Sequence, residues 1–167
     1  RNTSSIFIRG AGNFGGERGA ASRKIVIPSR EPDVVHTQKL DKNQALLYYH
    51  TGSDINPLHI NPKMSKMVGF SKPILHGLCT FGFTVRAVVK HFCNNNALQF
   101  KCLSCRFSNV VFPGETLQIK MWKTSPTTIA VITSVLDRGK DAITNAEAVL
   151  FNDETGKLSD LSVTSKL

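Results

Sequence analysis

The chain has 167 residues, of which 41% are hydrophobic, and it carries a formal net charge of +9. This length fits one ordinary domain with a sizeable core. No apolar run approaches the ~20 residues that a membrane span needs, and no signal-peptide pattern is visible. The Lys and Arg residues are spread along the chain, so we expect no nucleic-acid partner. A small ligand that carries several phosphates, or solubility alone, explains the charge as well.

Residues 1–33 are rich in Gly, Arg, Ser and Pro, which favours an extended, partly ordered lead-in. They contain Gly10-Ala11-Gly12-Asn13-Phe14-Gly15, which fits the GxGxxG pattern of dinucleotide-binding loops. That pattern requires a helix directly afterwards, and residues 16–28 show no helical periodicity. We therefore expect a glycine-rich loop there and not a dinucleotide site.

The pattern of a folded domain runs from residue 34 to residue 152. It opens with a predicted strand over 34–39. Asp41 and Gln44 have the spacing of a capping box, which predicts a helix through Tyr49 that stops near Gly52.

Two further helices are expected before the strands begin. Asn61 is a candidate N-cap because Pro62 follows it at the first helical position, and Gly69 lies past the end of this short helix. A long helix is predicted from about His76 to Phe92. It is apolar almost all round at its start, so we expect it to be buried in the centre of the fold.

The remainder reads as strands separated by Gly and Pro turns. Leu117, Ile119 and Met121 alternate with polar residues, as in a half-buried antiparallel strand. The predicted strand segments are 98–111, 115–123, 127–136 and 142–151. A long helix followed by such strands predicts an α+β fold in which an antiparallel sheet wraps around the helix.

The chain has four cysteines, and Cys102 and Cys105 form a CxxC pattern. Residues three apart on a strand face opposite sides, and no second metal-ligand pair accompanies this one. We expect no metal site, only small half-buried side chains.

The segment Asp54-Ile55-Asn56-Pro57-Leu58-His59 has the residue types of an acid/base site. On a helix, the five-residue gap between Asp54 and His59 would put them on different faces. Asn-Pro favours a turn, however, and a bent chain can aim both side chains at one point. Histidine can accept a proton near neutral pH, whereas Asp54 would donate one only if burial held it protonated. Anionic oxygen could bind at the start of the helix that follows.

Several stretches together form a specific combination: Tyr49 to Asp54, Asn56-Pro57-Leu58-His59, Gly69-Phe70 and Pro73-Ile74-Leu75-His76-Gly77-Leu78-Cys79-Thr80. The chain, from about Ser5 to Leu150, resembles the MaoC-like, hydratase 2 family of hot-dog-fold proteins. The resemblance implies a hydro-lyase that adds water reversibly to a trans-2-enoyl-CoA and gives a (3R)-3-hydroxyacyl-CoA. Coenzyme A is then part of the substrate, and no separate cofactor is implied.

The resemblance also implies the site residues. Asp54 and His59 match the catalytic pair of the family, and Asn56 matches a residue that orients water and the pair. The backbone N–H of Gly77 matches the donor to the thioester oxygen. Phe81 is a further candidate for contact with the acyl chain, although a core position is expected first. His76 could be a second base, but a role in fixing the helix start is favoured.

Hydratase 2 chains in eukaryotes normally hold two hot-dog repeats, and this chain resembles the C-terminal, catalytic one. The resemblance therefore implies a homodimer or pairing with a second repeat. Residues 153–167 form a polar tail that ends in Ser165-Lys166-Leu167, the SKL signal for the peroxisomal import receptor. We expect a peroxisomal location. Alternative functions are a hot-dog thioesterase and a non-catalytic acyl-CoA-binding half that needs its missing repeat.

Overall fold

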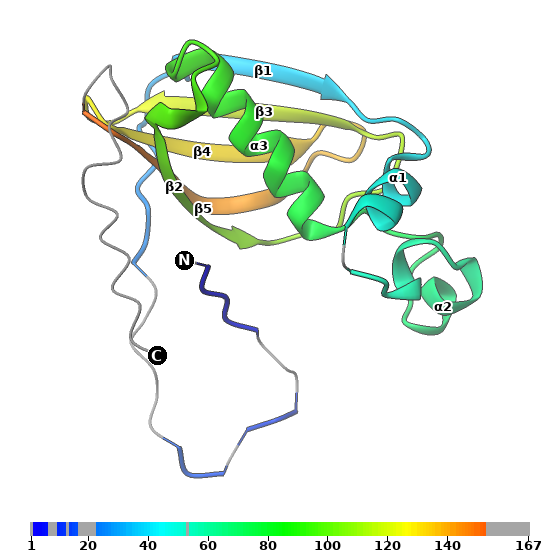
Figure 1. The fold of residues 1–167 in the computed structure, drawn as a ribbon. Helices are drawn as coiled ribbons and strands as arrows, with labels where there is room; N and C mark the ends of the chain where they lie inside the picture. Colours follow the sequence, from blue (N-terminus) through cyan, green and yellow to red (C-terminus); the bar gives the residue numbers. More distant parts are fainter. Residues whose placement is uncertain (1, 7–9, 13, 17–22, 53, 153–167) are drawn as a thin grey trace, which may run out of the picture.

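The structure is a computed structural model that describes residues 2–6, 10–12, 14–16, 23–52 and 54–152. One antiparallel sheet has the strand order β1-β3-β4-β5-β2, and the long helix α3 lies across one of its faces (Figure 1). None of the helices in the described part has the length and apolar character of a membrane span. The strands are β1 (Val34–Lys39), β2 (Phe100–Phe107), β3 (Thr116–Lys123), β4 (Thr128–Val135) and β5 (Lys140–Leu150). The helices are α1 (Gln44–Thr51), η1 (Pro57–His59), α2 (Pro62–Met67), α3 (Gly77–Phe92) and η2 (Ala97–Gln99).

The core lies between α3 and the sheet. Ala87 and Val88 of α3 pack on buried strand residues such as Ile119 and Met121. The alternation predicted for β3 is confirmed, because Leu117, Ile119 and Met121 are fully buried while the polar residues between them are half-buried. The predicted α+β arrangement of a sheet around one long helix is therefore the observed one.

The expectation that this helix is buried in the centre of the fold holds for one face of α3 only. Only one face of the helix meets the sheet, and Leu78, Gly82 and Arg86 are exposed on the other. Leu78 is 62% exposed, which is unusual for a leucine in the first turn of a central helix. Among the described residues, no second layer covers this face of the helix.

Part of the lead-in covers the sheet face opposite α3. Neighbouring residues of a strand point to opposite faces, so Trp122 points away from the side where Met121 contacts α3. Trp122 is nevertheless only 5% exposed, and its indole N–H donates to the carbonyl of Arg30 at 2.9 Å. Further along, Asn145 binds the backbone of Arg23 and Ile25 through its amide group.

Of the two predicted helix caps, one is confirmed and the other is wrong. Asn61 caps α2 as expected, because its Oδ1 accepts from the backbone N–H groups of Lys63 and Met64. The capping box at Asp41 and Gln44 was wrong. The Asp41 carboxylate instead accepts from the N–H of Asn43, and α1 begins without a side-chain cap.

One buried polar contact joins α3 to the sheet and can be tested. The hydroxyls of Thr84 and Thr133 lie 2.8 Å apart, and both residues are fully buried. Thr84 Oγ1 also donates to the carbonyl of Thr80 at 3.0 Å, so the Thr133 hydroxyl donates to Thr84. Thr84→Val should lower the free energy of unfolding by about 1–3 kcal/mol, because the Thr133 hydroxyl loses its partner. Thr133→Val should cost less, because the Thr84 hydroxyl keeps its bond to Thr80. The double variant should lose less than the sum, since no hydroxyl remains unpaired. Urea unfolding measures all three, and strictly additive losses would contradict this coupling.

Candidate functional site

The chain bends sharply between Asp54 and His59, as predicted. The Asp54 carboxylate accepts from the N–H of Asn56 at 3.1 Å, and the Asn56 side chain in turn accepts from the N–H of Leu58 at 3.0 Å. These two turns start the short helix η1, which ends at His59. The bend brings His59 Nε2 within 3.8 Å of Asp54 Oδ2. The two side chains therefore meet at one point.

The imidazole of His59 is fixed in one orientation. Its Nδ1 lies 2.8 Å from the carbonyl oxygen of Ile74, and a carbonyl only accepts hydrogen bonds. In the neutral ring the hydrogen is therefore on Nδ1, and the lone pair of Nε2 faces Asp54. The residue is buried, with 8% of its surface exposed. In this tautomer, the Nε2 atom of His59 can accept a proton.

A second histidine lies directly against the first. The ring of His76 stacks on the ring of His59 with centroids 3.6 Å apart and planes at 20°. His76 Nε2 lies 3.3 Å from the carbonyl oxygen of Asp54. The ring of Tyr48 in α1 also packs against the ring of His76. Sequence reasoning placed His76 at the start of the helix, where it is the N-cap of α3, but missed its contact with His59.

Gly77 is the first residue of α3, so its N–H has no acceptor within the helix. It lines a cavity of about 230 Å³ together with His59, Phe107 and Val110. A Cβ at Gly77 would lie 3.4 Å from the Phe107 ring, in ordinary van der Waals contact, so Phe107 packs beside the start of the helix. A small carbonyl compound in this cavity can meet a helix N-terminus on one side and His59 on the other.

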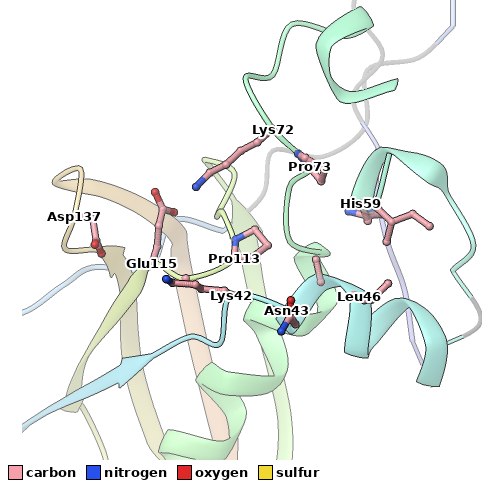
Figure 2. A pocket seen from close by; sticks show the side chains of 12 residues that line it. Lys42, Asn43, Leu46, His59, Lys72, Pro73, Pro113, Glu115 and Asp137 are labelled. Atoms are coloured by element: carbon pink, nitrogen blue, oxygen red, sulfur yellow. The ribbon is translucent and has the colours of Figure 1, made fainter. Parts of the chain in front are cut away.

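A larger cavity of about 690 Å³ opens on another side of His59 (Figure 2). Lys42 and Lys72 extend into it from two segments, and Glu115 and Asp137 lie at its far end. Glu115 is paired with Arg138 at 2.6 Å, whereas no ion pair within 4 Å is found for either lysine among the described residues. The cavity can accept an anionic group.

The Asp54 side chain is more exposed than a proton donor requires. A protonated Asp54 was expected to require burial, yet 56% of its side chain is exposed in the single chain. Nothing in the described part of this chain covers the carboxylate. Phe81, the candidate for acyl contact, is half-buried beside the core and lines neither of the two cavities.

Two other chemistries can be assessed from the geometry. Ligand atoms of Asp54, His59 and His76 lie within 4.8 Å of one another, which is close enough for a metal site. The two rings are stacked, however, so their nitrogen lone pairs run nearly parallel and do not converge on one ion. Burial raises the pKa of the nearby Cys79 thiol to about 11, which disfavours a thiolate nucleophile. All four cysteines are free.

Sequence reasoning missed the groups that hold this pair in place. The carbonyl of Ile74 orients His59, and Tyr48 packs on His76. Phe107 faces Gly77 from the end of β2. Ile74 lies within one of the recognised segments and Tyr48 directly precedes another, but no sequence signal points to Phe107. The tail with Ser165, Lys166 and Leu167 lies outside the described residues.

The family model "MaoC like domain" matches residues 24–153. The probable enoyl-CoA hydratase 2 of Dictyostelium discoideum is 43% identical over 159 residues, which is 95% of this chain and 54% of that protein. The chain thus spans about half the length of this relative.

Two solved structures are similar. Full-length peroxisomal multifunctional enzyme type 2 from Drosophila melanogaster superposes with a TM-score of 0.75 at 42% identity, over 82% of this chain and 25% of that one. The MaoC-like dehydratase from Phytophthora capsici gives a TM-score of 0.81 at 38% identity, over 87% of this chain and 51% of that one. The fold is the hot-dog fold, as expected. With a family match over most of its length and a shared fold, the chain belongs to the MaoC-like domain family.

Proposed function

We propose that the chain is the catalytic unit of an (R)-specific enoyl-CoA hydratase, with residues 34–152 as the hydratase domain. The observation that carries this proposal is that His59, which lies 3.8 Å from Asp54, lines one cavity together with Gly77 at the start of α3. The proposed reaction adds water to a trans-2-enoyl-CoA and gives a (3R)-3-hydroxyacyl-CoA. The names of the Dictyostelium and Drosophila relatives support it.

Each step of the proposed reaction has a group to perform it. The Nε2 of His59 takes a proton from water while the water oxygen bonds to C3 of the substrate. The electrons of the double bond move to the thioester oxygen, where the N–H of Gly77 stabilises the charge. The enolate electrons then form a C–H bond at Cα with a proton from Asp54, and the proton on His59 passes to Asp54, which restores both groups. The two proton-transfer roles could be coupled or exchanged. The reaction uses no cofactor, because coenzyme A enters with the substrate.

Asn56 has two groups with different tasks in this proposal. Its Oδ1 is occupied by the N–H of Leu58, which shapes the turn. Its amide Nδ2 has no hydrogen-bond partner among the described residues and is available to hold the water. The lysines of the larger cavity, Lys42 and Lys72, suit the phosphates of coenzyme A.

A second hot-dog unit is proposed to complete the site. The Asp54 side chain and one face of α3 are both exposed in the part of the chain that the structure describes. The strand β2 lies at the edge of the sheet with one side unpaired. Because the Dictyostelium relative is about twice as long, this unit is proposed to be a second repeat or a second copy of the chain. Covering Asp54 would also disfavour its charged form, as a proton donor requires.

The proposed location is the peroxisome. The tripeptide Ser165-Lys166-Leu167 has the sequence of a signal for the peroxisomal import receptor. Relatives from Drosophila and mouse are named as peroxisomal enzymes. The contact of Phe81 with the acyl chain stays a prediction.

The acid/base pair is tested by replacing each member. Asp54→Asn and His59→Gln should lower the rate of crotonyl-CoA hydration by about 10²–10⁴-fold, because each removes a proton-transfer group. Loss of enoyl absorbance measures the rate, and chiral analysis should find the 3R product. Asp41→Asn is a matched control, since Asp41 makes the same turn as Asp54, and it should keep full activity.

Two outcomes would contradict the proposal. Substantial hydration by either folded variant would refute the assigned pair. Release of free thiol from acyl-CoA without loss of enoyl absorbance would instead indicate a thioesterase. Ligand binding without turnover, with activity restored by an added upstream repeat, would instead show that the second unit is a separate repeat and not a second copy of this chain.

The two tasks of Asn56 can be separated with one substitution. Asn56→Ser keeps an oxygen that can accept from the N–H of Leu58, so the unfolding free energy should change by no more than about 0.5 kcal/mol. The amide Nδ2 is lost, and hydration should slow by about 10–100-fold because the water is less well placed. Thermal unfolding and steady-state kinetics measure the two effects. Unchanged hydration would show that Asn56 only shapes the turn.

A further inference from the structure

No step of the proposed reaction uses His76, although it is more deeply buried than His59, with 2% of its surface exposed. Each side of the residue contacts a different part of the site. Its Nε2 reaches the main chain at Asp54, its ring face covers His59, and its own backbone precedes Gly77. His76 thus contacts Asp54 and His59 and directly precedes Gly77, the three residues that the proposed reaction requires.

The hydrogen bonding of His76 fixes its protonation state. Because the carbonyl of Asp54 can only accept, Nε2 carries the hydrogen. Among the described residues, Nδ1 of His76 is the one buried side-chain nitrogen or oxygen without a hydrogen-bond partner. A second proton on this atom would be a buried charged donor with no acceptor, which is costly. The ring is therefore held neutral, with a bare lone pair on Nδ1.

The surroundings of the ring act in the same direction. Burial lowers the pKa of His76 most, the neighbouring His59 lowers it further, and the hydrogen bond and charge of Asp54 oppose them. The titratable groups that face the ring are His59, Asp54 and Tyr48. With its pKa below the usual value of about 6.5, His76 is neutral at and above that pH.

A neutral His76 matters for the chemistry of His59. When His59 takes a proton from water it becomes a cation, and a like charge at the stacking distance would oppose that step. A neutral ring in the same place holds His59 by its face without this repulsion. The stack also blocks rotation of His59 away from the carbonyl of Ile74.

We propose that His76 is a positioning residue: as a neutral imidazole it fixes the loop at Asp54 and the ring of His59, and leaves His59 free to become charged. This inference rests on the proposed hydratase function. It assigns His76 no contact with the substrate and no proton transfer of its own. Its effect should therefore fall on the rate of the chemical step and not on substrate binding.

Three variants separate the two contacts of His76. His76→Ala removes both and should lower kcat by about 10²-fold with KM unchanged, because the acid/base pair is misplaced while the binding cavity remains. His76→Gln restores an N–H that can reach the carbonyl of Asp54, and His76→Phe restores a ring against His59. Each should recover part of the lost kcat. Thermal unfolding identifies variants that fail to fold, and His76→Phe, which fills the space, keeps the test valid if His76→Ala does not fold.

The matched control is His36, which contacts His91 at 3.1 Å at the other end of α3. His36→Ala breaks a histidine pair that is exposed and edge-to-face, away from the site, and should leave kcat unchanged. A folded His76→Ala with wild-type kcat, or with a raised KM at wild-type kcat, would overturn the proposal. So would a loss of kcat of equal size in His36→Ala.

A second measurement needs no enzyme activity. In ¹⁵N NMR spectra of the unmodified chain, His76 should show a neutral ring with hydrogen on Nε2 between about pH 6.5 and 8. A cationic His76 in this range, or hydrogen on Nδ1, would overturn the proposal. If the wild-type chain fails to hydrate enoyl-CoA even with an added upstream repeat, the proposed function fails, while the NMR spectra still decide the state of His76.

Discussion

Two reciprocal hydrogen bonds join the loop 54–59 to the segment that enters α3. His59 donates from Nδ1 to the carbonyl of Ile74, and His76 donates from Nε2 to the carbonyl of Asp54. Each segment thus supplies one imidazole and one carbonyl, and the two imidazoles stack between them. The distance between Asp54 and His59 and the placement of both next to Gly77 depend on this connection. Without it, a loop with an exposed carboxylate would have no fixed relation to the start of the helix.

Two exposed features, the Asp54 carboxylate and one face of α3, indicate where the site lacks a cover among the described residues. A carboxylate that donates protons needs a low-dielectric site, and Asp54 is exposed to solvent here. An apolar helix needs packing on both sides, and α3 has the sheet on one side only. The same end of α3 carries Leu78, Gly77 and the cavity, so one added layer could cover all of them. Catalysis and assembly are therefore linked in this proposal.

Features that depend on local chemistry could be predicted from the sequence. The cap at Asn61, the alternation of β3 and the bend at Pro57 follow from the residues themselves. The capping box at Asp41 failed because a neighbouring N–H, two residues on, competed for the carboxylate. Trp122 lies on the side of β3 that the alternation assigns to polar residues. It is nevertheless buried, and its indole N–H donates to the carbonyl of Arg30, far away in the chain.

Features that depend on tertiary contacts could not be predicted in this way. The identity of the catalytic candidates follows from their motif, but the stack of His59 on His76 joins residues that are 17 positions apart. No periodicity connects them, because one lies in a turn and the other caps a helix. The exposure of Asp54 is equally invisible in the sequence, since it depends on which layer covers the end of the sheet.

The central claim is that Asp54, His59 and the N–H of Gly77 share one substrate. A crystal structure of the chain with a bound (3R)-3-hydroxyacyl-CoA tests this most directly. The account predicts the thioester oxygen about 2.7–3.1 Å from the Gly77 nitrogen, with the C3 hydroxyl between His59 Nε2 and the Asp54 carboxylate. A thioester bound away from Gly77, with His59 and Asp54 in contact only with solvent, would contradict it.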